Sequence, residues 1–208
     1  MLKNKENIVI IVILILHLVG IGGLMSENFH DLFIKLVPYN LLVTTGLLLF
    51  THKHWNKQFI AFIGLCFGIG FAVEAVGVNT GLIFGDYYYG DVLGVKLFET
   101  PLMIGVNWLL LVYAVGSITS KYGSNWILKS ILGAALLVIL DVIIEPVAIN
   151  LDFWQWLSLG IPIKNYVGWF VTGFVLLAIF HLLKFDKQNK VGMAVYLIQV
   201  IFFIALRQ

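Results

Sequence analysis

Three carboxylic acids lie inside apolar stretches of the sequence. Glu74 interrupts the apolar run 59–78, and Asp141 and Glu145 interrupt the run 131–149. An ionisable side chain in such surroundings is costly to bury and by default marks a functional site. Burial disfavours the carboxylate form, so a buried acid keeps its proton near neutral pH and can act as a general acid. The three residues therefore predict acid chemistry in an apolar environment.

The composition indicates an integral membrane protein. The chain has 208 residues, of which 61% are hydrophobic and 12% charged, and its mean hydropathy is +0.99. Soluble domains are about half apolar and about a quarter charged. A net charge of +2 is too small to indicate nucleic-acid binding. We expect one integral membrane domain over residues 1–208, with the lipid bilayer as its surroundings.

The apolar runs predict an all-α fold, a polytopic bundle of about seven transmembrane helices. A helix needs roughly 20 residues to cross a bilayer, and the runs are continuous, without the two-residue alternation of strands. The predicted spans are 7–24, 33–50, 58–78, 101–120, 126–145, 166–185 and 191–206. Pro146 is expected to end the fifth helix directly after Glu145.

The basic residues predict the orientation of these helices. Nine lysines fall on the side of the N-terminus: Lys3, Lys5, Lys53, Lys57, Lys121, Lys129, Lys184, Lys187 and Lys190. Four cations fall on the opposite side: Lys35, Lys96, Lys164 and Arg207. Because cytoplasmic loops carry the excess of Lys and Arg, we expect a cytoplasmic (inner) membrane protein with its N-terminus in the cytoplasm and its C-terminus outside.

Two stretches of the chain share one order of residues. In each, a glutamate is followed five residues later by an asparagine, then by an acidic and aromatic connection, and then by a proline with a tryptophan seven residues beyond it. The two sets are Glu74, Asn79, Pro101 and Trp108, and Glu145, Asn150, Pro162 and Trp169. Helices three and four could thus be a parallel repeat of helices five and six. The connections differ in length, so chance similarity explains the pattern equally well.

The repeat would bring the acids together near the outer interface of the bundle. The candidate catalytic residues are Glu74, Asp141 and Glu145. Polar and aromatic residues nearby are candidates for substrate binding: Asn79, Thr80, Tyr87, Asn107, Trp108, Asn165 and Trp169. Each has a structural alternative, since aromatic residues also collect at bilayer interfaces and buried amides also serve packing.

The sequence implies neither a metal nor a cofactor. Its histidines lack the spacing of metal ligands on a helix, and it contains no phosphate-loop or dinucleotide fingerprint. The single cysteine, Cys66, excludes an internal disulfide.

Two motifs resemble a known family. The run Glu-x-x-Gly-x-x-Thr-Gly-x-x-Phe-Gly-x-Tyr at 74–87 and the stretch from Pro101 to Trp108 resemble the membrane-bound carotenoid hydratases. This family includes bacterial carotenoid 1,2-hydratases and archaeal bisanhydrobacterioruberin hydratase. The stretches 141–146 and 165–169 fit it too, so the resemblance covers helices two to six.

The resemblance implies a cofactor-independent enzyme of carotenoid biosynthesis. Such an enzyme adds water across the terminal C1–C2 double bond of an acyclic end group, in a lycopene-like or γ-carotene-like substrate. Protonation at C2 leaves a tertiary cation at C1, which water captures. From the residues themselves, Asp141 or Glu74 is the acid. Glu145, with Asn79 or Asn165, positions the water.

Two other functions fit parts of the pattern. A carotenoid end-group cyclase or isomerase begins with the same protonation but excludes water. A non-catalytic small-solute transporter could use the acids as proton relays. That transporter would need a polar path through both halves of the bilayer, and the runs 59–67 and 131–138 show no polar line.

Overall fold

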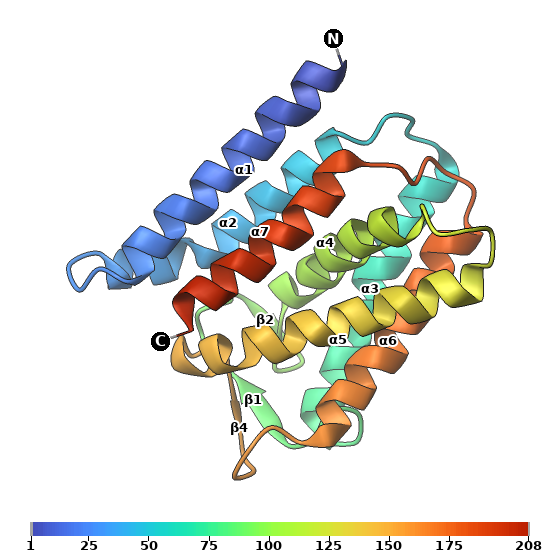
Figure 1. The fold of residues 1–208 in the computed structure, drawn as a ribbon. Helices are drawn as coiled ribbons and strands as arrows, with labels where there is room; N and C mark the ends of the chain where they lie inside the picture. Colours follow the sequence, from blue (N-terminus) through green and yellow to red (C-terminus); the bar gives the residue numbers. More distant parts are fainter. Residues whose placement is uncertain (1, 208) are drawn as a thin grey trace.

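The computed structural model describes residues 2–207, which fold into a bundle of helices with four short strands (Figure 1). In chain order the elements are α1 (Leu2–Leu24), α2 (His30–Phe50), α3 (Lys57–Thr80), β1 (Tyr87–Tyr89), β2 (Lys96–Leu97), β3 (Thr100–Pro101), α4 (Leu102–Thr119), α5 (Trp126–Asn150), β4 (Trp154–Trp156), α6 (Ile163–Leu182) and α7 (Lys190–Leu206). The prediction of an all-helical architecture with about seven helices is confirmed.

Helix α4 forms the centre of the bundle. It contacts α2, α3, α5, α6 and α7, and every residue in 108–117 is buried. A helix that is apolar on all sides is stable only when neighbours cover it all round. Figure 1 shows α1 at one edge beside α2 and α7, with α3, α5 and α6 on the other side of α4.

Six of the described helices, α1 to α6, are long and apolar enough to cross a membrane. They contain spans of 18 to 25 residues, which fits the thickness of the hydrocarbon layer. Helix α7 has 17 residues and packs against α1 and α4. The chain is thus an integral membrane protein, while its orientation in the bilayer stays a prediction.

Local sequence explains where several helices begin and end. The side chains of Asn56, Asn125 and Asn189 accept hydrogen bonds from the first backbone N–H groups of α3, α5 and α7, as N-cap residues do. Helix α3 is terminated by Gly81, the residue after its last turn, whose φ of 64° lies in the left-handed region that glycine adopts readily.

The prediction that Pro146 ends the fifth helix is wrong. Helix α5 continues through Pro146 to Asn150, so Glu145 lies inside a helix and not at its end. Proline removes one backbone donor, and neighbouring helices in a bundle tolerate that loss. Helix α2 contains Pro38 in the same way.

The connections after α3 and α5 meet at one end of the bundle. Strand β1 follows α3, strand β4 follows α5, and the two pair antiparallel (Figure 1). A second small pair joins β2 to β3 just before α4. Equivalent segments of the two matched stretches thus lie against each other, which is the contact expected of two units related by a two-fold axis.

Close approach of α3 and α4 depends on Gly70. A Cβ atom built on this residue would lie 2.6 Å from the Cβ of Trp108, so only glycine lets the Trp108 side chain lie where it does. Gly70 is also one helical turn before Glu74, on the same face.

Replacing Gly70 with alanine should therefore destabilise the protein. We expect Gly70→Ala to lower the free energy of unfolding by about 1–3 kcal/mol, as overpacking does. Gly68→Ala on the same helix is the matched control, because nothing lies within 4 Å of its added Cβ. Thermal unfolding in detergent micelles measures both. Equal melting temperatures for the two variants would contradict this account.

Candidate active site

Glu74 is held by three hydrogen-bond donors near the C-terminal end of α3. Its side chain is buried, and its Oε2 accepts bonds from the hydroxyls of Tyr87 at 2.8 Å and Tyr89 at 2.7 Å. Its Oε1 accepts a bond from the indole N–H of Trp108 at 3.0 Å. Such fixed donors stabilise negative charge that appears on a carboxyl group.

Glu145 has a parallel set of donors near the C-terminal end of α5. Its Oε2 accepts bonds from the indole N–H groups of Trp154 at 3.1 Å and Trp156 at 2.9 Å. Its Oε1 accepts a bond from the amide of Asn165 at 3.1 Å. Each glutamate is thus bound by two aromatic donors from the following connection and by one residue of the next helix.

Asp141 lies one turn before Glu145 on α5 and is linked to it through Asn165. The Asn165 amide nitrogen donates to Asp141 Oδ2 at 2.7 Å as well as to Glu145. Asp141 is fully buried, and no described residue bonds its other oxygen, Oδ1. A buried polar atom without a partner is rare and calls for a functional explanation or a bound water.

The pairing of β1 with β4 aligns the four aromatic donors. Tyr87 lies opposite Trp156, and Tyr89 lies opposite Trp154. Residues two apart on a strand, and residues directly opposite on its partner, project from the same face. All four side chains therefore share one face of the ribbon, and we call them the aromatic ladder. The intervening Tyr88 is 51% exposed.

The tyrosines of the aromatic ladder keep their protons. Burial raises the pKa of the Tyr87 and Tyr89 phenols, and the adjacent Glu74 carboxyl raises it further. Both hydroxyls are therefore neutral donors at physiological pH. A phenol also accepts hydrogen bonds, whereas an indole N–H only donates. The phenols beside Glu74 can therefore accept a bond from a protonated carboxyl, and the indoles beside Glu145 cannot.

A small cavity of about 30 Å³ lies between the two glutamates. That volume is sufficient for a water molecule with polar partners. Its walls are Glu74, Phe84, Tyr87, Tyr89, Ile104, Asn107, Trp108, Glu145, Trp154, Trp156, Asn165 and Trp169. The Trp108 and Trp169 rings pack together there, with centroids 4.6 Å apart.

The structure brings most of the expected site residues together. Of the candidates, Glu74, Tyr87, Asn107, Trp108, Glu145, Asn165 and Trp169 line the cavity, and Asp141 lies directly behind Asn165. Asn79 and Thr80 lie elsewhere. The Asn79 amide donates to the carbonyls of Ala75 and Phe98, and the Thr80 hydroxyl donates to its own helix.

Tyr89, Trp154 and Trp156 hold the glutamates but were not among the candidates from the sequence. One sequence feature could have identified them. In each connection two aromatic donors lie two residues apart, and a strand places such residues on one face. No three His, Cys, Asp or Glu side chains within residues 2–207 gather as ligands for a metal ion.

Comparison with known proteins identifies the family. The profile of a family described as "Carotenoid biosynthesis protein" matches residues 36–207. The chain belongs to the carotenoid biosynthesis protein family. The matched range includes both glutamates, Asp141, the aromatic ladder and the whole of the small cavity.

Within this family, the chain is similar to a curated archaeal protein. It is 27% identical over 132 residues to a protein named bisanhydrobacterioruberin hydratase from Haloarcula japonica. The similarity covers 57% of this chain and 43% of the relative, so the chain spans less than half the length of that protein. No solved structure matches this member of the carotenoid biosynthesis family.

The hydrogen bonds to Glu74 predict an unequal effect of two neighbouring substitutions. Tyr89→Phe leaves a buried carboxyl oxygen with one donor fewer, and we expect a loss of about 1–3 kcal/mol in unfolding free energy. Tyr88→Phe, on the exposed face of the same strand, should change little. Chemical unfolding in detergent compares them, and equal losses would show that the bond to Glu74 does not stabilise the fold.

Proposed function

We propose that this protein is a carotenoid hydratase. It adds water across the terminal C1–C2 double bond of an acyclic carotenoid end group, without a cofactor. The single observation that carries the proposal is the pair of buried glutamates, each held by three donors, on either side of a water-sized cavity. Membership of the family and the name of the archaeal relative support the same reaction.

Glu74 is the proton donor in this proposal. Its Oε2 partners are two phenols, which accept as well as donate, so protonated Glu74 can donate to one phenol and still accept from the other. Over each turnover, the proton that Glu145 takes from water replaces the one that Glu74 gives to carbon, so the cycle consumes no net proton. When the proton passes to C2 of the alkene, the three donors stabilise the carboxylate that remains.

The tertiary cation at C1 is stabilised by its surroundings. The Glu74 carboxylate supplies negative charge, and Trp108 and Trp169 line the cavity as a packed pair. Indole rings attract cations through their negative faces, with a contribution of about 2 kcal/mol or more when water is excluded. A short-lived cation formed at the edge of this water-sized cavity is thus protected until water reaches it.

Glu145 accepts the proton of the attacking water. Its partners are the N–H groups of Trp154, Trp156 and Asn165, which only donate, and this arrangement suits the carboxylate form. Asn107 also lines the cavity, and its amide has no hydrogen bond to any other described residue, so it is free to orient the water. Asn79, bound to backbone carbonyls elsewhere, has no part in this step.

Asp141 is a positioning residue in this scheme. It does not line the cavity, and its bond to the Asn165 amide fixes the group that also holds Glu145. Two nearby carboxyls resist ionising together, so a protonated Asp141 leaves the negative charge on Glu145.

Two finer assignments complete the proposal. The substrate is a lycopene-like or γ-carotene-like carotenoid, and the distribution of lysines favours an orientation with the two glutamates toward the outer face of the cytoplasmic membrane. Hydration is favoured over end-group cyclisation because the cavity beside the acids has room for water.

Expression in a lycopene-producing host tests the reaction. The protein should convert the pigment to a product heavier by one water, as seen by mass spectrometry. Glu74→Gln and Glu145→Gln should each lower product formation by about 100-fold or more, the usual contribution of general acid–base groups.

Asp91→Asn is the control, because Asp91 lies in the same connection as Tyr87 and Tyr89 but is exposed and forms an ion pair with Lys96. It should keep wild-type turnover. A product of unchanged mass with altered absorption would identify a cyclase or isomerase. Full hydration by both glutamine variants would refute the assignment of the glutamates.

A further inference from the structure

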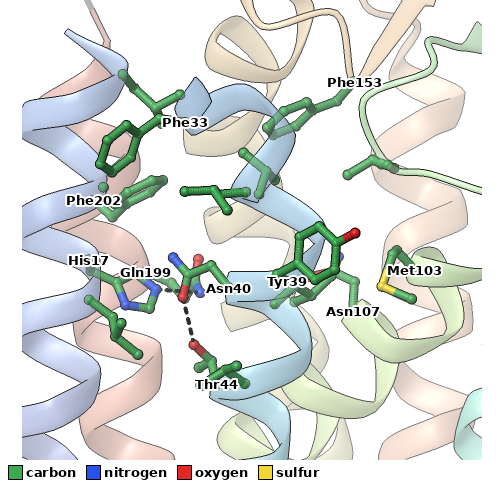
Figure 2. A pocket seen from close by; sticks show the side chains of 18 of the residues that line it. His17, Phe33, Tyr39, Asn40, Thr44, Met103, Asn107, Phe153, Gln199 and Phe202 are labelled. Carbon is green, nitrogen blue, oxygen red and sulfur yellow. Dashed lines mark hydrogen bonds between the residues drawn. The ribbon is translucent and has the colours of Figure 1, made fainter. Parts of the chain in front are cut away.

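A second, larger hollow lies beside the acid site. It has a volume of about 370 Å³, within the range of ligand pockets. Its walls come mainly from α1, α2, α4 and α7 and are largely apolar. Representative wall residues are Val37, Leu41, Met103, Ile144, Phe202 and Phe203. Figure 2 shows Phe33 and Phe202 on one side of the hollow and Met103 and Asn107 on the other.

The hollow and the small cavity share part of their walls. Ile104, Asn107 and Trp154 line both spaces. Trp154 is also a donor to Glu145. One side of the hollow therefore adjoins the acid site at a junction made of these three side chains.

The polar side chains in the hollow are largely paired with one another. His17 bonds the carbonyl of Ile13 through Nδ1 at 2.8 Å, and its Nε2 lies 3.2 Å from the amide nitrogen of Gln199. The Thr44 hydroxyl donates to Asn40 at 3.2 Å, as Figure 2 shows. These pairings reduce the demand for polar groups on an occupant, so an apolar chain fits the hollow.

The hollow is also accessible from the lipid phase. Tyr39 and Val43 of α2 line it, yet their side chains are 63% and 48% exposed on the surface of a helix that spans the membrane. A hydrophobic molecule dissolved in the bilayer can therefore enter sideways, without crossing water.

We propose that this hollow binds the hydrocarbon arm of the carotenoid substrate and aims its end group at the two glutamates. The identity of the occupant rests on the proposed function. Apolar walls alone would also accept the acyl chain of a lipid. The position of the hollow directly beside the acid cavity favours a chain whose terminus reacts there, and we expect that terminus to reach the acids at the shared wall of Ile104, Asn107 and Trp154.

Filling the hollow tests this inference. Val37→Phe on α2 and Leu16→Phe on α1 add volume inside it. Leu42→Phe and Leu18→Phe are the matched controls, on the same helices but at exposed positions outside the lining. The full chain is purified in detergent after growth in a lycopene-producing host. Retained pigment is measured by absorbance, and retained lipid by mass spectrometry.

Both filling variants should retain about tenfold less pigment than wild type, while both controls retain wild-type amounts. Melting temperatures within a few degrees of wild type establish that the filling variants are folded. Because the two substitutions lie on separate helices, the test still works if one variant does not fold. Equal retention by all proteins would overturn the inference, as would a wild-type hollow filled by phospholipid and not by pigment.

Pigment retention does not depend on turnover, so the two proposals fail separately. If the filling variants lose pigment but the wild-type protein never hydrates it, the binding site is supported and the hydratase is refuted. Hydration that proceeds equally in wild type and both filling variants supports the hydratase and refutes the binding site.

Discussion

Two carboxyl groups buried in a membrane protein need hydrogen-bond donors, and this need organises one end of the bundle. Glu74 and Glu145 are each satisfied by three donors. An unsatisfied polar group in such a place costs several kcal/mol. The β1–β4 pairing supplies four of the six donors. The short ribbon is therefore part of the acid site as well as a connection between helices.

The two sets of donors are alike in layout but different in chemistry. Both glutamates bind aromatic side chains two residues apart, but those of Glu74 are phenols and those of Glu145 are indoles. Phenols can reverse a hydrogen bond and indoles cannot. A nearly symmetric frame can thus hold one carboxyl that exchanges protons and one that stays an acceptor, which is the division of roles that hydration of an alkene needs.

Much of the helical architecture could be predicted from the sequence, because long apolar runs have few alternatives to a membrane helix. The three acids could also be identified from the sequence, because ionisable residues within such a run are rare. The extent of α5 could not be predicted from Pro146, because tertiary packing determines whether a helix tolerates proline.

The partners of the acids were harder to predict than the acids themselves. Asn79 and Thr80 lie within six residues of Glu74 in sequence, but the end of α3 directs them to backbone carbonyls. Tyr89, Trp154 and Trp156 have the composition of a bilayer interface. Only the register of two short strands, far apart in the chain, shows that they converge on the glutamates.

The most direct test of the central claim follows hydrogen from solvent to carbon. Enzyme and lycopene are incubated in deuterated water, and deuterium bound to carbon is measured by mass spectrometry. Wild-type product should carry one deuterium next to the new alcohol. Glu145→Gln keeps the proton donor Glu74 but cannot activate water, so it should return lycopene that has gained deuterium. Glu74→Gln should introduce no deuterium. Deuterated product or lycopene from Glu74→Gln would contradict the account.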